Sequence, residues 1–153
     1  MEEALKDTIL NYLKGHNTMT LATSGEGGPW AASVFYANDG FTLYFLSEPT
    51  SRHSVDIEKN QMVAVTINED YKDWREIQGI QLYGHAGRVG SRRERAKALT
   101  LYRAKYPFVG KMLLSPKIAR AIARVKFYKV VPRWIRFIDN RVEFGHKKEM
   151  TLE

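Results

Sequence analysis

The hydrophobic residues at the start of the chain recur at helical spacing, and those that follow alternate with polar residues in short runs. We predict a helix over Glu2–Lys14, with Gly15 just past its end and an apolar face comprising Leu5, Ile9, Tyr12 and Leu13. The alternating runs predict strands at Thr18–Thr23, Trp30–Tyr36, Phe41–Leu46 and Met62–Asn68.

Turn residues and a second helix separate these strands. The sequence NDG at residues 38–40 is a hairpin signal. Ser51–Asn60 has the pattern of a short helix, in which Ser51 can cap the first turn while Val55 and Ile57 form the apolar side. A longer strand is predicted over Ile77–Val89, where the glycines at 79, 84 and 87 indicate bends at a barrel corner.

The pattern becomes helical again between residues 91 and 124. A helix from Ser91 to Tyr106 is predicted to bury Ala96, Leu99, Leu101, Tyr102 and Tyr106. A further helix is predicted at about Pro116–Arg124. A last strand region, Lys126–Phe144, is expected to break at Pro132 and to turn at residues 139–140.

Together these elements predict a mainly β protein, a small six-stranded β-barrel with peripheral helices, in one domain over residues 1–153. A chain of 153 residues buries roughly 68–70% of its unfolded surface, so it can form a core without disulfides. It has no cysteine, which excludes thiolate catalysis and cysteine-ligated metal centres and favours a cytoplasmic location. Because the chain starts with acidic residues and has no long apolar run, we expect that the protein is not exported and has no membrane partner.

The net charge of +7 is unevenly distributed. Residues 1–90 contain 7 Lys and Arg against 12 Asp and Glu, whereas residues 91–153 contain 17 against 5. The basic third could bind a nucleic-acid backbone with strong salt dependence, could be a solvated helix surface, or could contact the acidic part of a second copy. Because it has no known nucleic-acid motif, a nucleic-acid partner is the least favoured of these interpretations.

The segment from Tyr44 to His53 carries the candidate chemistry. It places a strand end directly before Ser51, Arg52 and His53 at a helix start, where free N–H groups and the helix dipole favour an anion. Arg52 could bind a phosphate through two hydrogen bonds, or it could lie in solvent while Ser51 merely caps the helix. The histidines have no metal-ligand spacing, so no metal site is predicted.

Five segments carry a family resemblance: TLAT at 20–23, WAASVFY at 30–36, LYFLSEPTSRH at 43–53, REIQGIQLYG at 75–84 and IRFIDNRVEFGHKK at 135–148. In their order and spacing the chain resembles the FMN-binding split-barrel proteins related to pyridoxamine 5′-phosphate oxidase. The resemblance implies a six-stranded split barrel and a homodimer with FMN in the grooves between two protomers.

The same resemblance implies a set of cofactor-binding residues. Ser33, Val34 and Phe35 match the strand that lies along the flavin ring, and Leu46 and Ser47 match a strand end that contacts it. Ser51, Arg52 and His53 match the phosphate-binding segment, with His53 where many relatives have lysine. A glutamine facing the ring corresponds to Gln81 or Gln78, of which Gln81 is preferred.

The resemblance therefore implies an FMN-dependent oxidoreductase that transfers a hydride or electrons between the flavin and a small-molecule substrate or electron donor. No residue stands out as a general acid or base, so no catalytic side chain is assigned. Two alternatives stay open: a split barrel that binds deazaflavin or haem, the latter through His85 or His146, and a basic nucleic-acid-binding module.

Overall fold

A computed structural model of the chain describes residues 2–152. Its elements, in chain order, are α1 (Glu2–Gly15), β1 (Thr18–Gly25), β2 (Gly28–Phe35), β3 (Ala37–Asp39), β4 (Thr42–Ser47), α2 (Arg52–Lys59), β5 (Met62–Asn68), a 3₁₀ turn (Trp74–Glu76), β6 (Gln78–Arg88), α3 (Arg92–Lys105), α4 (Phe108–Met112), α5 (Pro116–Ile122), β7 (Lys126–Asp139) and β8 (Lys147–Thr151). None of the described helices is long and apolar enough to cross a membrane.

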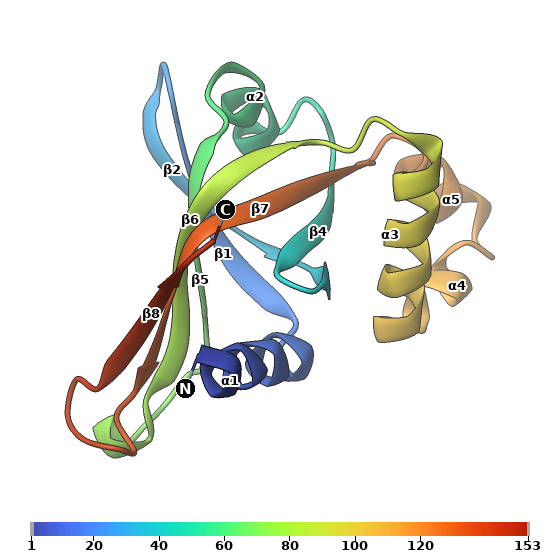
Figure 1. The fold of residues 1–153 in the computed structure, drawn as a ribbon. Helices are drawn as coiled ribbons and strands as arrows, with labels where there is room; N and C mark the ends of the chain where they lie inside the picture. The colour runs from blue at the N-terminus through green and yellow to red at the C-terminus, as the bar shows by residue number, and fades with distance from the viewer. Residues whose placement is uncertain (1, 153) are drawn as a thin grey trace.

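The strands form one antiparallel sheet that curls into a half-barrel (Figure 1). Their order is β2-β1-β5-β6-β7-β4-β3, with β8 added to β7. The predicted mainly β split barrel is therefore confirmed, but the sheet has eight strands instead of six. The two additional strands are short: β3 is one arm of the predicted hairpin at residues 38–40, and β8 follows the last predicted turn.

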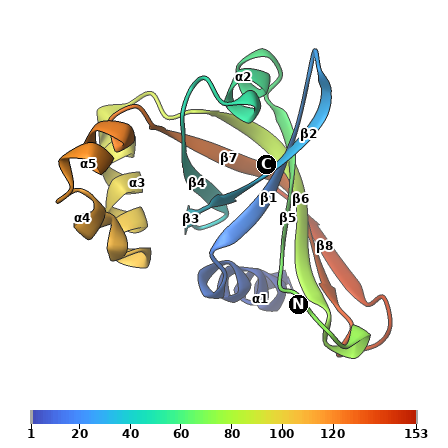
Figure 2. The ribbon, with the colours of Figure 1, turned by 180° about the vertical axis from the view of Figure 1, so that it is seen from behind.

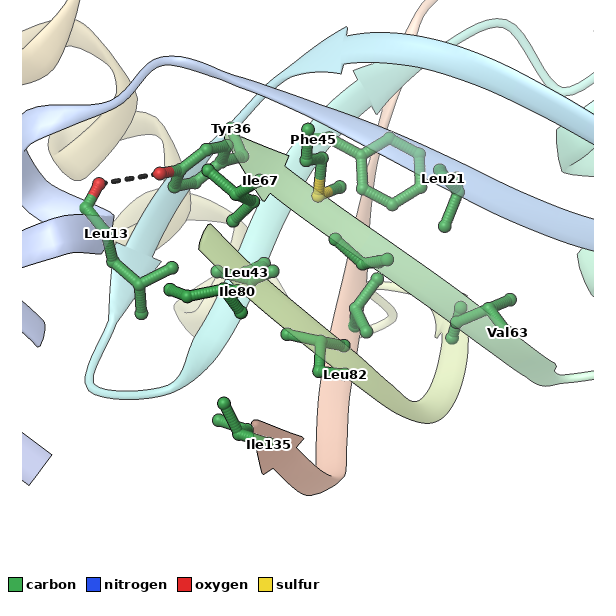
Figure 3. Close-up of a cluster of buried hydrophobic side chains, with 14 of the residues drawn as sticks. Leu13, Leu21, Tyr36, Leu43, Phe45, Val63, Ile67, Ile80, Leu82 and Ile135 are labelled. Carbon is green, nitrogen blue, oxygen red and sulfur yellow. Dashed lines mark hydrogen bonds between the residues drawn. The ribbon is translucent and has the colours of Figure 1, made fainter. Parts of the chain in front are cut away.

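The core lies inside the curl of the sheet and is closed by α1. Ile9 and Leu13 of α1 are almost fully buried against the inward-facing residues of the strands. Figure 3 shows Tyr36 reaching α1 from the end of β2, where its hydroxyl donates to the Leu13 carbonyl oxygen at 2.7 Å. The alternation of buried and exposed residues along β5 places Val63, Val65 and Ile67 inside and leaves the opposite face of the sheet outside.

A β-bulge lets β6 and β7 remain paired across Pro132. The register shifts after Tyr83, so that Gly84 pairs with Pro132 while Tyr83 pairs with Trp134. A Cβ on Gly84 would lie 2.2 Å from the Val131 carbonyl oxygen, so this position requires glycine. The predicted bend at Gly84 is present, whereas the predicted break at Pro132 is wrong because the bulge accommodates the missing N–H.

The helices α3, α4 and α5 lie together at one side of the molecule (Figures 1 and 2). Ala98 and Tyr102 of α3, Tyr106 and Val109 pack with Tyr44 and Phe127 of the sheet in a second, smaller core, to which α5 contributes no buried residue. The predicted face of α3 is correct at Tyr102 and Tyr106, but Ala96 and Leu99 are exposed because Ala98 takes the inward position. The sequence pattern also missed α4, and it placed Val55 on the buried side of α2, where it is exposed.

Candidate functional site

Three serines and a histidine meet where β4 ends and α2 begins. The Ser47 hydroxyl oxygen lies 2.7 Å from His53 Nε2 and 2.9 Å from the Ser51 hydroxyl oxygen. The hydroxyl of Ser54, on the first turn of α2, donates to that of Ser47 at 2.8 Å, and its oxygen lies 2.9 Å from that of Ser51. Ser47 and Ser54 are buried, so this serine–histidine cluster is a fixed group of polar atoms beneath the helix start.

The first turn of α2 has no side-chain cap. The Ser51 hydroxyl donates to the Glu48 carbonyl oxygen at 2.8 Å and accepts from none of the first-turn N–H groups. At the two other helices preceded by serine, Ser91 accepts from the Glu94 N–H and Ser115 accepts from the Ile118 N–H. The expectation that Ser51 caps α2 through its side chain is therefore wrong. Its orientation leaves the N–H groups at this helix start open to an anion.

Arg52 lies at the edge of the cluster and points to the turn between β1 and β2. One guanidinium nitrogen donates to the Gly27 carbonyl oxygen at 2.9 Å, and the guanidinium carbon lies 4.2 Å from the centre of the Trp30 ring. The group is exposed and has five N–H donors, so the bond to Gly27 leaves donors for a ligand. Arg52 is thus held beside the open helix start by contacts that still allow it to bind an anion.

His53 is half-buried and carries little positive charge near neutral pH. Burial lowers the pKa of its imidazole, and the nearby Asp56 carboxylate opposes this shift only in part. Asp56 is itself buried and accepts a hydrogen bond of 2.8 Å from the Thr23 hydroxyl. His53 therefore presents a largely neutral hydrogen-bonding ring to the serine hydroxyls beneath the helix start.

Two residues that were expected to contact the flavin ring, Ser33 and Gln81, lie on the outer face of the sheet. The strand register aligns one outer row of residues, Ser33, Thr20, Thr66, Gln81 and Arg136, in that order across β2, β1, β5, β6 and β7. Ser33 and Gln81 thus point to the same face, three strands apart, which at the usual strand spacing is about 14 Å. One protomer does not bring them into a single pocket.

The remaining expected residues are divided between the two cores and the sheet edge. Val34 packs against the main core and Leu46 against the smaller one. Phe35 is half exposed, with its ring 5.2 Å from that of Tyr106 and 6.1 Å from that of Phe108. In the part of the chain that the structure describes, the expected residues that meet in one place are therefore Ser47, Ser51 and His53, with Arg52 beside them.

Comparisons with known proteins agree with this architecture. The family model of pyridoxamine 5′-phosphate oxidase matches residues 5–139. The chain belongs to the pyridoxamine 5′-phosphate oxidase family. A UPF0306 protein of Klebsiella pneumoniae is 31% identical over 141 residues, which cover 91% of this chain and 88% of the relative.

Solved structures show the same fold at low sequence identity. A putative pyridoxamine 5′-phosphate oxidase from Listeria innocua superposes with a TM-score of 0.66 at 20% identity, over 87% of this chain and 97% of that chain. A heme binding protein from Mycobacterium smegmatis gives 0.71 at 18% identity, over 92% of this chain and 56% of that chain. Proteins with this fold therefore include one named for heme binding and one named for the oxidation of pyridoxamine 5′-phosphate.

Within this pyridoxamine 5′-phosphate oxidase family member, sequence reasoning missed Ser54 and the pair of Thr23 and Asp56. Ser54 closes the serine–histidine cluster, and Asp56 is the charged group beside His53. The three-residue step from Ser51 to Ser54 at the start of α2 is a signal that could have indicated a shared face, whereas Ser47 ends β4 and helical spacing does not apply to it. Nothing in the sequence pairs Thr23 with Asp56, because they come from β1 and α2.

Proposed function

We propose that this protein is an FMN-binding oxidoreductase that acts as a homodimer on a small molecule. The observation that carries the proposal is the uncapped start of α2, which presents open N–H groups, the Ser51 hydroxyl and the Arg52 guanidinium together. A phosphate monoester fits this donor set, since it needs hydrogen-bond donors and positive charge at one point. The family to which the chain belongs supports FMN as the phosphate ligand.

Arg52, Ser51 and the first-turn N–H groups of α2 would hold the phosphate, and His53 would fix the orientation of Ser47 and Ser51. When bound, FMN supplies hydride or electron transfer, chemistry that no side chain provides. Ser33, Phe35 and Gln81 offer an exposed hydroxyl, ring and amide for a flat cofactor. The role of the chain is therefore to position the cofactor and exclude water from it.

The outer face of the sheet suits contact with a second copy. Beside the outer row runs a neighbouring row, Ala31, Ala22, Ala64, Tyr83 and Trp134, in which the last two rings stack at 5.6 Å. The exposed Tyr83 and the partly buried Trp134 beside exposed alanines form an apolar surface of the kind that a symmetric interface covers. A two-fold partner would bring its own Gln81 toward Ser33, which one protomer cannot do alone.

Arg52→Ala tests the phosphate assignment, with Arg75→Ala as the matched control. Both arginines are exposed and lie over a tryptophan, Trp30 for Arg52 and Trp74 for Arg75. We expect purified protein to bind FMN in a titration followed by flavin absorbance, and Arg52→Ala to bind about 10–100-fold more weakly. Equal affinity in the Arg52 and Arg75 variants would refute the assignment.

The dimer is tested by Ala64→Glu, which places a charge in the centre of the neighbouring row. Ala64 is exposed in one protomer, so the variant should fold as the wild type does. Sedimentation is expected to show a dimer for the wild type and a monomer for the variant, with weaker FMN binding. A wild-type monomer would overturn this part of the proposal.

Haem is a second candidate because of a hollow of about 470 Å³ on the outer face. Met62, Tyr83, His85 and Arg133 line it, and Arg133 Nη1 lies 3.4 Å from His85 Nδ1. An imidazole beside an arginine and an aromatic ring could hold a planar anionic cofactor. A haem absorbance spectrum that His85→Ala abolishes and His146→Ala retains would favour haem over FMN. No haem spectrum in the wild type would exclude it.

A further inference from the structure

A groove of about 500 Å³ lies between α1, β3 and α3. Leu10 and Asn11 of α1 and Leu101 and Ala104 of α3 form its two sides, and Ala37 and Asn38 of the edge strand β3 lie between them. The volume is within the roughly 300–1,000 Å³ typical of small-molecule sites. Its walls are mainly apolar, but Lys14 and Lys105 also line it.

Lys105 is a half-buried cation with a fixed position. Its ammonium group donates to the carbonyl oxygens of Leu13, at 3.3 Å, and of His16. It also lies 4.0 Å from the centre of the Tyr36 ring and 5.7 Å from that of Tyr106. These contacts hold the ammonium group where the end of α1 meets the groove.

No carboxylate within residues 2–152 forms an ion pair with Lys105. The chain provides such partners elsewhere on the same helix and strands: Lys97 pairs with Asp39 at 2.8 Å, and Lys129 pairs with Glu94 at 3.0 Å. Carbonyl dipoles and ring faces compensate only part of a full charge, and burial lowers the pKa of Lys105 to about 8. A half-buried cation with incomplete compensation is stabilised by an anion that reaches it.

We propose that this groove binds an amphipathic anion, a medium-chain carboxylate, with the carboxylate on Lys105 and Lys14 and the alkyl chain along Leu10, Leu101 and Ala104. Charge complementarity selects the anionic head, because both cations lining the groove are lysines and no acid lines it. The apolar walls select the chain, which loses its contact with water on binding. The residues that line this groove include none of those assigned to the proposed FMN site.

Octanoate, 1-octanol and octylamine test the proposal, since they share a chain and differ in charge. Binding is followed by amide chemical shifts of the full-length protein. Octanoate is expected to shift Asn38, Leu101 and Ala104 and to bind at least about tenfold more tightly than octanol. Octylamine is expected not to bind. Equal binding of octanoate and octanol, or shifts confined to other parts of the fold, would overturn the proposal.

Lys105→Met retains the alkyl stem and removes the charge, and Lys111→Met on α4 is its matched control. Octanoate affinity should fall about 10–100-fold in the first variant and stay unchanged in the second. If Lys105→Met fails to fold, the test uses Lys14→Glu instead, because Lys14 is exposed. This variant should weaken octanoate binding and leave octanol binding unchanged. Unchanged octanoate binding in Lys14→Glu would refute the site.

A pH titration gives a readout that a purely structural lysine would not. The groups facing Lys105 are Lys14 on α1, Tyr36 beyond β2 and Tyr106 after α3, and burial raises the pKa of both tyrosines so that they stay neutral. Octanoate binding should therefore weaken as pH rises through about 8, where Lys105 loses its proton. A flat profile between pH 7 and 9 would contradict the proposed contact.

Discussion

The starts of α2 and α3 have the same residue type at the same position and use it in opposite ways. Ser91 accepts from the Glu94 N–H at 3.0 Å, and the Glu94 carboxylate in turn binds Tyr44 and Lys129. Ser51 turns toward Glu48, Ser47 and Ser54, and the first turn of α2 contains no acid. The start of α3 is thus satisfied by its own chain, whereas the start of α2 remains open to a ligand.

The difference originates three residues into each helix. Glu94 allows the α3 start to build a charged network with β4 and β7, which is compatible with a side-chain cap. Ser54 instead offers a buried hydroxyl that draws Ser51 inward. A serine before a helix therefore does not by itself identify a cap, and the residue at the third helical position decides its role.

The largest effect should come from Ser51→Asp, which gives α2 a strong cap. The new carboxylate would accept from the first-turn N–H groups and would repel a phosphate at the same point. We expect FMN affinity to fall at least about 100-fold, by the loss of donors and by like-charge repulsion, with the free energy of unfolding unchanged or raised. FMN titration and urea unfolding of the same sample measure both quantities. Ser91→Asp, the equivalent change at α3, should leave FMN affinity unchanged; an effect equal to that of Ser51→Asp would contradict the comparison.

Glu94→Ala should have the next largest effect, and on stability alone. It leaves the half-buried Lys129 ammonium and the Tyr44 hydroxyl without their partner, at a cost of about 1–3 kcal/mol in the free energy of unfolding. Urea unfolding measures it. Because Glu58 is an exposed acid on α2, Glu58→Ala is the control and should change stability by less than about 0.5 kcal/mol. Equal costs for the two variants would show that the α3 network adds little.

Sequence patterns could predict most of the helices and strands, but not that Ser51 and Ser91 act differently at the two helix starts. The strand at Met62–Asn68 is predicted to the residue because its alternation is uninterrupted, and the helix predicted over Ser51–Asn60 is one residue too long at each end. β8 was missed because Met150 is its one buried residue, so its pairing with β7 has almost no local signal. The alignment of Ser33 with Gln81 depends on the order of four strands, which local patterns do not contain.

The serine pair itself provides a smaller effect. Ser91→Ala removes a true cap and should cost about 1 kcal/mol in the free energy of unfolding, with no change in FMN affinity. Ser51→Ala removes no cap, so its cost should come only from the exposed bond to Glu48 and the part-buried contacts with Ser47 and Ser54, while FMN affinity falls several-fold. Thermal unfolding and FMN titration of both variants make the test. A loss of affinity in Ser91→Ala as large as in Ser51→Ala would show that the two starts are not functionally distinct.

The smallest expected effect is on the pH dependence of stability: the contributions of His53 at the α2 start and of Glu94 at the α3 start to the free energy of unfolding should be lost in different pH ranges. Burial lowers the pKa of His53 below its ordinary value of 6.5, so the folded state favours the neutral ring, and its contribution is complete above pH 6.5 and is lost as pH falls through the lowered pKa. Hydrogen bonds from Tyr44 and Lys129 lower the pKa of Glu94 from 4.5, so its contribution is complete above pH 4.5 and is lost only in more acidic solution.

Urea unfolding between pH 7 and pH 3 of the wild type, His53→Gln and Glu94→Gln separates these ranges. The wild type should lose stability relative to His53→Gln as pH falls below 6.5, and relative to Glu94→Gln only below 4.5. Phosphate should reverse the first trend, since an anion at the α2 start favours the protonated ring of His53 and so raises its pKa. The opposite result is that phosphate leaves unchanged the pH range in which stability is lost relative to His53→Gln, while Arg52→Ala still weakens FMN binding. That result would show that the anion contacts Arg52 but not the serine–histidine cluster. The open helix start would then not be the part of the site that holds the phosphate.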